Sequence, residues 1–303
     1  ALWCAPAPGL TLQEKRDVTR QLLSAGAEIS EMNAVRKHLS RIKGGGLLEA
    51  ALPARVLTLA VSDVAGDRPD HIGSGPTVPD PTSFADALAV LRDRGIEESV
   101  PGAVRRRLER GAAGQYAETL KPGAVPDDRF ELRVVAALGD ALEAARAEAD
   151  SRGQRTRLLG PILYGEAREL ARSLAVRARS LRSEGGGLLI AGGEPTVRVR
   201  GAGRGGRCQE LALAFALELG GADGITALFA GTDGSDGPTA AAGAFADPGT
   251  LERAAARGLD ARAHLDRNDS HSLLSASGDL YVTGPTQTNV TDLALIHIGR
   301  RFG

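Results

Sequence analysis

The order of apolar and polar positions along the chain predicts alternating helices and strands. Thr11 and Glu14 form a capping-box pattern that opens a helix reaching to about residue 27, and a second helix is expected over 28–41. The apolar run at 56–61 has no polar alternation, which is typical of a strand covered on both faces. This first stretch therefore indicates helices packed with a buried strand.

The same alternation continues to the end of the chain. It predicts helices that begin at Ser83 and extend over 141–151, 166–181 and 207–219, and strands at 131–138, 157–159, 188–191, 196–200, 225–230, 280–283 and 293–298. Helices between strands favour an α/β fold with parallel strands. The glycine-rich stretch at 183–187 is the expected linker between a Rossmann-like domain, residues 1–184, and a smaller α/β domain, residues 185–303.

Composition narrows the classes of function. The 303 residues are 42% hydrophobic and carry a formal net charge of -1, so neither nucleic acid nor a membrane surface is an expected partner. Two cysteines and the absence of a membrane-length apolar run predict a cytoplasmic protein. The sequence does not determine the oligomeric state, for which a homodimer is one option. The first residues read like the inside of a domain, so we expect an upstream segment.

Polar loops follow the predicted strands, at the sheet edge where α/β proteins bind ligands. The loop at 62–67 continues to 73–77 and combines two carboxylates with small residues whose backbone amides can approach an anion. Ordinary turn residues would give the same composition. Lys43 belongs to a basic group beyond a helix C-terminus, where the helix dipole alone favours cations.

The loop at 201–210 matches the G-x-G-x-x-G pattern of dinucleotide-binding proteins. The preceding residues 197–200 alternate apolar and charged side chains, unlike a buried Rossmann strand, so we disfavour a nicotinamide site. Arg207 instead falls in the first turn of the next helix, where its guanidinium and the helix amides could hold a phosphate or carboxylate. A solvated arginine is the alternative interpretation.

Two further loops carry candidate chemistry. Asp233 and Asp236 lie three residues apart among hydroxyls and glycines, a combination that suits a magnesium ion bound together with substrate phosphates. The loop at 284–292, which contains Asn289, is dense in hydroxyl and amide groups. Plain turns remain the alternative for both loops.

Together these motifs resemble the type II glycerate kinases, whose C-terminal half is called MOFRL. The likeness is carried by ordered stretches along essentially the whole chain, at 33–45, 62–67, 73–77, 192–197, 205–213, 231–239 and 283–290. The resemblance implies two α/β domains, with a MOFRL-like domain at 185–303. It also implies an active site in the cleft between them, where ATP and Mg²⁺ serve to phosphorylate D-glycerate at the 2-hydroxyl.

The resemblance also assigns roles to residues. It implies that Arg207, Asp233 and Asp63 are catalytic and that Asp233 and Asp236 hold the metal. The expected substrate- and nucleotide-binding residues are Lys43, Ser62, Asp67, Ser74, Gly75, Thr77, Glu194, Gly205, Gly206, Gln209, Thr232 and Asn289.

The chain departs from the family pattern in three places. The family has an upstream segment with a glycine-rich loop and a lysine, an acidic residue where Ala240 stands, and a glycine where Gln287 stands. Two rival functions also stay open. One is an oxidoreductase that acts on hydroxypyruvate or tartronate with NAD(P)H, and the other is a non-catalytic nucleotide or metabolite sensor.

Overall fold

The computed structural model describes residues 3–299 and divides into two compact units. Of the described residues, the first unit comprises 3–60 and 64–135, and the second comprises 61–63 and 136–299. Residues 136–184, which the sequence analysis assigned to the first domain, therefore pack with the second unit. These units are defined by compactness and do not test the boundary between family domains. The domain boundary predicted at 184/185 stays a prediction.

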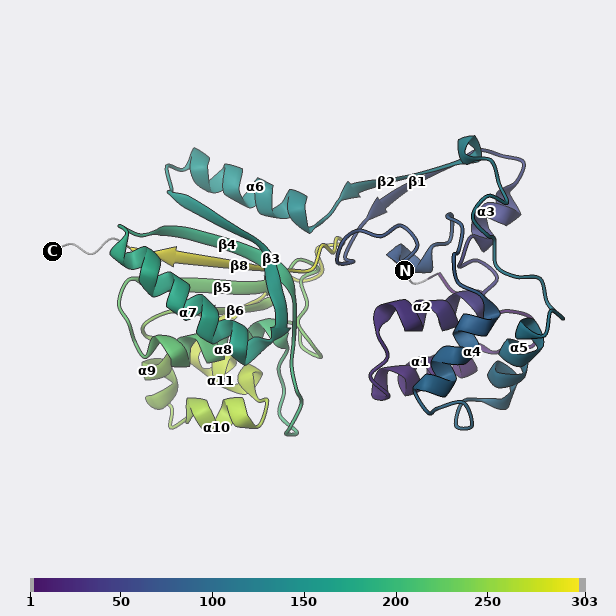
Figure 1. Ribbon diagram of the computed structural model, residues 1–303. Helices are drawn as coiled ribbons and strands as arrows, with labels where there is room; N and C mark the ends of the chain where they lie inside the picture. The colour runs from purple at the N-terminus through teal and green to yellow at the C-terminus, as the bar shows by residue number, and fades with distance from the viewer. Residues whose placement is uncertain (1–2, 300–303) are drawn as a thin grey trace. The chain divides into compact units, whose positions relative to one another are not determined.

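Helices dominate the first unit (Figure 1). Its elements are α1 (Leu12–Ser24), α2 (Ile29–His38), α3 (Gly46–Ala51), α4 (Phe84–Asp93), α5 (Gly102–Ala112), the 3-10 helices Ile72–Ser74 and Asp127–Arg129, and the strands β1 (Val56–Val61) and β2 (Phe130–Ala136). The predicted capping box at Thr11 is confirmed, because its side chain accepts the Glu14 amide at 3.2 Å. The Ser83 cap is confirmed in the same way.

A mixed sheet forms the centre of the second unit. Its helices are α6 (Leu138–Ser151), α7 (Ala167–Ser183), α8 (Arg207–Leu219), α9 (Thr250–Ala255), α10 (Ala261–Asp266) and α11 (Ser270–Ser277). Its strands are β3 (Thr156–Glu166), β4 (Gly187–Thr196), β5 (Ile225–Gly231), β6 (Gly243–Ala246), β7 (Leu280–Tyr281) and β8 (Asp292–Ile298), in the order β3-β4-β8-β5-β6-β7. Only β3–β4 pairs in parallel among these described strands, and the other four pairs are antiparallel.

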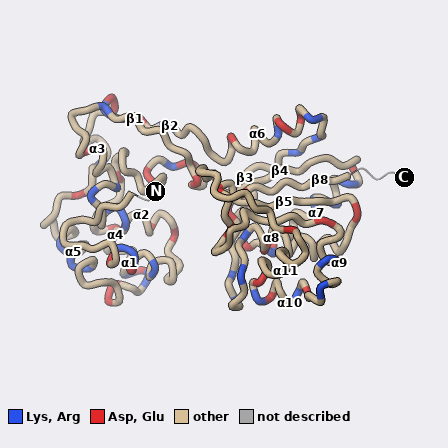
Figure 2. The backbone as a smooth tube through the Cα atoms, turned by 180° about the vertical axis from the view of Figure 1, so that it is seen from behind, with Lys and Arg blue, Asp and Glu red and all other residues tan. Residues whose placement is uncertain are grey.

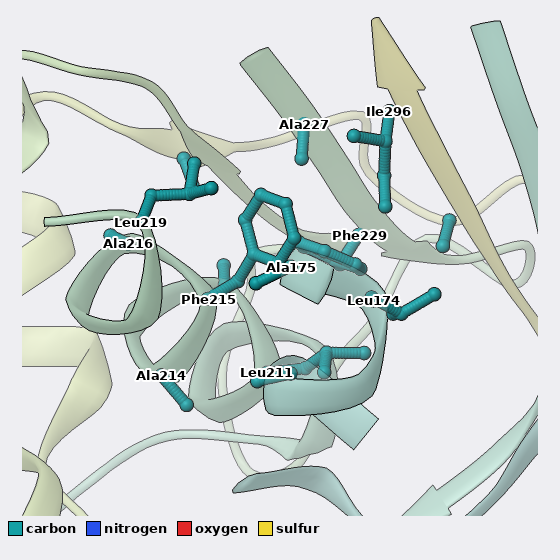
Figure 3. Close-up of a cluster of buried hydrophobic side chains, with 14 of the residues drawn as sticks. Leu174, Ala175, Leu211, Ala214, Phe215, Ala216, Leu219, Ala227, Phe229 and Ile296 are labelled. Carbon is teal, nitrogen blue, oxygen red and sulfur yellow. The ribbon is translucent and has the colours of Figure 1, made fainter. Parts of the chain in front are cut away.

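The main core lies between this sheet and the helices α7 and α8 (Figure 3). Phe215 of α8 meets Phe229 of β5 edge to face, with ring centroids 5.3 Å apart. On the opposite face of β4, Gly192 lies against Leu138 and Leu142 of α6. The sheet is therefore covered on both faces at β4, as its continuous apolar sequence requires.

Three predicted strands differ from the structure. The strand expected at 157–159 extends over Thr156–Glu166 as β3. β1 was expected to be buried on both faces, and this was wrong: Leu57, Leu59 and Val61 are exposed, Leu59 by 63%. β1 pairs only with β2 in a two-stranded sheet, so it lacks the second cover that a central strand has. The residues 197–200 form no strand. The Arg198 and Arg200 amides donate to side chains, of Glu166 at 3.1 Å and Asn268 at 2.6 Å, where a strand would use a neighbouring backbone.

Charged residues of both signs are interspersed along the chain (Figure 2), in agreement with the net charge of -1. Within residues 3–299, no helix has the length and apolar character needed to cross a membrane.

Candidate active site

The register of β8 gathers the candidate residues of the second unit at one end of the sheet. Asp292, the first residue of β8, pairs with Gly193 of β4 on one side and with Gly231 of β5 on the other. β5 therefore ends beside the start of β8, while β4 continues past this point to Thr196. Glu194 follows Gly193 in β4, and Thr232 is the first residue after β5. Both therefore lie at the same edge of the sheet.

Arg207 spans two of these strand ends. Its Nε and Nη2 donate to the two carboxylate oxygens of Asp292 at 2.6 and 3.1 Å, and its Nη1 donates to Glu194 Oε1 at 2.6 Å. Asp292 is 3% exposed, whereas Glu194 is 53% exposed. A two-point bond between a guanidinium and a buried carboxylate fixes the plane of the guanidinium. Arg207 is consequently held by Asp292 and contacts Glu194 at its solvent side.

Charge and burial act against each other at this pair. Burial raises the pKa of Asp292, and the hydrogen bonds and charge of Arg207 oppose that rise. Burial lowers the pKa of Arg207, but the hydrogen bonds and charges of Asp292 and then Glu194 outweigh it and raise that pKa above the usual range. The guanidinium therefore stays charged.

Asp236 caps the helix that begins at Arg207. Its carboxylate accepts the backbone amides of Cys208 at 3.0 Å and Gln209 at 2.8 Å, and the Gln209 side chain donates to it at 3.0 Å. Burial raises the pKa of Asp236, and these amide bonds oppose the rise. The amides at the start of this helix were expected to meet a ligand anion, but a carboxylate of the chain itself accepts two of them.

The same cap explains the glycines before Arg207. A Cβ at Gly206 would come within 2.2 Å of the Asp236 carboxylate, and one at Gly205 within 2.2 Å of Ser270 Oγ. Both positions need the absence of a side chain for close packing inside the protein. The start of α8, which carries Arg207, is therefore held in place by contacts among Gly205, Gly206, Gln209 and Asp236. In the structure Asp236 is a helix cap.

Asp233 lies in a loop that is joined to the 284–291 loop. The Thr232 hydroxyl donates to the Thr291 carbonyl at 2.7 Å and accepts the Val290 amide at 2.8 Å. The Asp233 carboxylate accepts the amide and hydroxyl of Ser235, at 2.8 and 3.0 Å. Gly234 has a φ of 85°, and a Cβ there would lie 2.1 Å from the Gly284 carbonyl, so only glycine fits. These contacts hold Asp233 in a fixed turn.

Asn289 connects the last loop to the first one. Its side-chain amide donates to the Asp63 carboxylate at 3.1 Å across 226 residues of sequence, and its carbonyl oxygen accepts the Thr291 amide at 3.0 Å. Ser62 and Asp63 belong to the second unit, next to the end of β1. Asp63 and Asn289, two predicted site residues, are therefore in direct contact.

The remaining predicted residues lie in the first unit, where two motifs meet. The Lys43 amine donates to the Gly73 carbonyl at 2.6 Å, and the Gly44 and Gly45 amides donate to the carbonyls of Ser74 and Gly75 at 3.0 and 2.8 Å. Ser74 is buried with a φ of 64°, a conformation that a non-glycine residue adopts rarely. The loops around 43–45 and 73–75 therefore form one rigid cluster.

Two more predicted residues lie elsewhere in this unit. The Thr77 hydroxyl contacts that of Thr58 on β1 at 2.6 Å. Asp67 has a φ of 49° in its turn.

Asp292 is the residue that sequence reasoning missed. It stands at the end of a polar loop and the start of an apolar strand, so it read as a boundary residue. A buried carboxylate that opens an otherwise apolar strand needs a partner, and the arginine at the start of a neighbouring helix was the available cation. That requirement was the signal that could have identified it.

Comparisons with known proteins agree with this arrangement. Residues 187–292 match the MOFRL family, and residues 1–109 match a "Domain of unknown function (DUF4147)". A protein of Agrobacterium vitis named "Putative hydroxypyruvate reductase" is 47% identical over 306 residues, which cover 99% of this chain and 68% of that protein. The "D-glycerate 2-kinase" of Thermotoga maritima is 39% identical over 302 residues, covering 97% of this chain and 69% of that protein.

A solved structure shares the fold. The crystal structure of glycerate kinase from Thermotoga maritima superposes with a TM-score of 0.84 at 40% identity, and the match covers 98% of this chain and 70% of that chain. The α/β class and the two-part arrangement predicted from the sequence are confirmed.

The fold and the loops around Arg207 define an α/β protein that combines a DUF4147 part with a MOFRL part. Relatives of this identity and coverage then decide the family. The chain belongs to the type II glycerate kinase family, as the motifs indicated.

Proposed function

We propose that this chain is part of an ATP-dependent kinase that transfers the γ-phosphoryl group to D-glycerate at its 2-hydroxyl. The observation that carries the proposal is Arg207, whose guanidinium is fixed by the buried Asp292 and contacts the more exposed Glu194. Phosphoryl transfer depends on positioning and charge stabilisation more than on covalent chemistry by the protein. A fixed guanidinium among carboxylate-bearing loops supplies both requirements.

The side chains around Arg207 receive complementary roles in this proposal. Arg207 exchanges its bond with Glu194 for one to the transferring phosphoryl group. There it stabilises the negative charge on the phosphoryl oxygens. Asp233 orients the 2-hydroxyl of glycerate and accepts its proton as the new O–P bond forms and the bond to ADP breaks. Asp63, oriented by Asn289, helps to position the substrate. Thr232 keeps the Asp233 loop in place through its two backbone contacts.

Mg²⁺ fits the donors of this site with one restriction. Magnesium keeps several waters and needs only one or two protein carboxylates in addition to substrate phosphates, whose negative charge it neutralises. Within residues 3–299, no cluster of three or more potential ligands is assembled, so the ion would depend on ATP. Asp236 is buried and both its oxygens accept donors at the start of α8, whereas Asp233 is partly exposed and its carboxylate accepts from the exposed Ser235, so Asp233 is the carboxylate that we propose to hold the metal.

A reductase is the second candidate, because the name of the relative from Agrobacterium vitis mentions hydroxypyruvate reductase. In dinucleotide-binding folds the pyrophosphate lies on the amides at the start of the helix after the glycine loop. Here Asp236 accepts the Cys208 and Gln209 amides, so a pyrophosphate would meet a carboxylate. This contact argues against a nicotinamide site in the 201–206 loop.

The test is a kinase assay on the full-length protein. We expect ATP-dependent phosphorylation of D-glycerate, with ³¹P NMR identifying the 2-phosphate. Arg207→Lys should lower kcat at least tenfold without lowering the melting temperature by more than a few degrees, because an ammonium cannot reproduce the two-point bond and the outward donor together. Saturable NADH binding without any binding of ATP would refute the kinase and favour the reductase.

A further inference from the structure

A basic cavity lies in the first unit, outside the loops of the Arg207 site. It has a volume of about 400 Å³ and lies against α1, α2 and the residues before α3. Lys15, Arg36 and Lys43 line it, together with Arg16 and Arg20, and Trp3 is the aromatic residue on its wall. No Asp or Glu is among the described residues that line it.

The three inner cations of this cavity have no carboxylate partner among residues 3–299. The Lys15 side chain is buried, with the residue 8% exposed, and its amine has no hydrogen-bond partner. Lys43 is also buried, and its amine donates to a single backbone carbonyl, that of Gly73. Arg36, half-buried beside them, forms no ion pair with a described residue.

These cations also repel one another. Burial lowers the pKa of Lys43 to about 8, with Arg36 and Lys15 lowering it further as like charges nearby. Burial likewise lowers the pKa of Lys15, and Arg36 adds to that effect. Elsewhere in the same unit the buried Lys37 has the partner that such a group requires, Asp80 at 3.1 Å. The unpaired Lys15 therefore stands out as a group built for an anion that is not part of the described chain.

We propose that this cavity is a phosphate-binding site formed by Lys15, Arg36 and Lys43. A phosphate group carries close to two negative charges and three acceptor oxygens, which matches the three cations that line the cavity better than a carboxylate with one charge and two oxygens. Trp3 lines the cavity with an exposed side chain, which provides a flat apolar surface beside the three cations. The site stands on these observations alone and does not depend on the kinase assignment.

The phosphate group has two possible sources: a nucleotide, or a small phosphorylated compound or free phosphate. Binding of ATP much tighter than of inorganic phosphate would identify the nucleotide as the source. Equal or weaker binding of ATP would identify the small anion, because a nucleotide would then gain nothing from its base or from Trp3.

The experiment uses Trp3, the only tryptophan among the 303 residues, as a reporter. Fluorescence is followed while inorganic phosphate, sulfate or ATP without metal is added to the full-length protein, and Trp3→Phe shows which part of the signal arises at the cavity. Melting temperatures are measured in parallel with and without each anion. We expect a saturable change with phosphate or ATP and a rise in melting temperature.

Lys15→Met is the decisive variant, since it keeps the length of the buried stem and removes the charge. It should weaken phosphate binding at least tenfold, and it should melt no lower than the parent in the absence of phosphate because the parent buries an unpaired charge. Arg20→Met is the matched control: it lies on the same helix and the same cavity, but Arg20 is exposed and paired with Asp17 at 3.0 Å. Its affinity should change by less than about twofold.

The opposite pattern would overturn the proposal. If no anion changes the Trp3 signal or the melting temperature, and Lys15→Met lowers the melting temperature, then Lys15 is paired with a carboxylate from outside residues 3–299. Unchanged phosphate affinity in Lys15→Met would also overturn it. Phosphate binding in a protein without glycerate kinase activity would refute the proposed function and leave this site intact.

Discussion

Replacing Asp292 by Asn tests whether Arg207 acts in a fixed orientation. The substitution keeps the size of a side chain that is 3% exposed but removes the charge and one of the two acceptors for Arg207. The remaining bond to Glu194 is exposed and cannot hold the guanidinium plane alone. We therefore expect Arg207 to lose its orientation while the rest of the site keeps its shape.

The structure sets the expected magnitudes. Breaking a fully buried ion pair costs about 3–5 kcal/mol. Because the Arg207 side chain is 34% exposed and can hydrate, we expect Asp292→Asn to lower the free energy of unfolding by only about 1–2 kcal/mol. Loss of orientation at a group that stabilises transferring charge should lower kcat by about 10- to 100-fold, with a smaller change in KM.

The assay combines steady-state kinetics on D-glycerate with denaturant unfolding, and Asp279→Asn is the matched control. Asp279 is another buried carboxylate of the second unit that pairs with an arginine, Arg253, away from the Arg207 loops. Its Asn variant should lose comparable stability but keep kcat. If both variants lose stability and neither loses kcat, Asp292 is a structural residue and the reasoning about a fixed guanidinium is refuted.

Three further predictions follow from the structure. Asp233→Asn should lower kcat about 100-fold or more with little change in the Kd for ATP measured by calorimetry, whereas a lowered melting temperature with unchanged kcat would mark a turn residue. Gln287→Gly should raise the free energy of unfolding by up to about 1 kcal/mol in denaturant titrations, because Gln287 adopts a φ of 63°; a decrease would show that its side chain makes contacts that outweigh the strain. Lys43 has a pKa of about 8 in the folded protein against 10.5 in the unfolded chain, so folding disfavours its charged form. Between pH 8 and 10.5 the free energy of unfolding should therefore rise with pH, by at most about 3 kcal/mol more than that of Lys43→Met. Parallel pH profiles of the two proteins would contradict this expectation.

The parts of the fold that local sequence decides were predicted well. Helices α1 and α4 begin where Thr11 and Ser83 supply hydroxyl caps, and α8 begins at Arg207 and ends before Gly220, as its apolar spacing indicated. Strand pairing was not accessible in the same way. The parallel arrangement was inferred from helices between strands, but β8 returns after a loop without a helix and pairs antiparallel with both β4 and β5.

The candidate site shows the same division. Arg207, Glu194, Thr232 and Asp233 were identified because polar residues follow apolar strands, and they do lie at one end of the sheet. The role of Asp236 depends on a contact across 28 residues with the start of α8, which no spacing rule contains. The exposure of β1 likewise depends on which elements fail to cover it. The catalytic and binding roles of the candidate site residues stay predictions.

The charges around Arg207 predict which of its two carboxylate partners an incoming anion would displace. One guanidinium faces two carboxylates, so the cluster carries a net charge of about −1 before any ligand arrives. A phosphate that takes the place of one of them relieves the excess negative charge, and this replacement costs least where the carboxylate can return to water. Glu194 is 53% exposed and makes one bond to Arg207, whereas Asp292 is buried and makes two. If Arg207 binds a phosphate, we therefore expect Glu194 to be displaced and Asp292 to keep the guanidinium aligned.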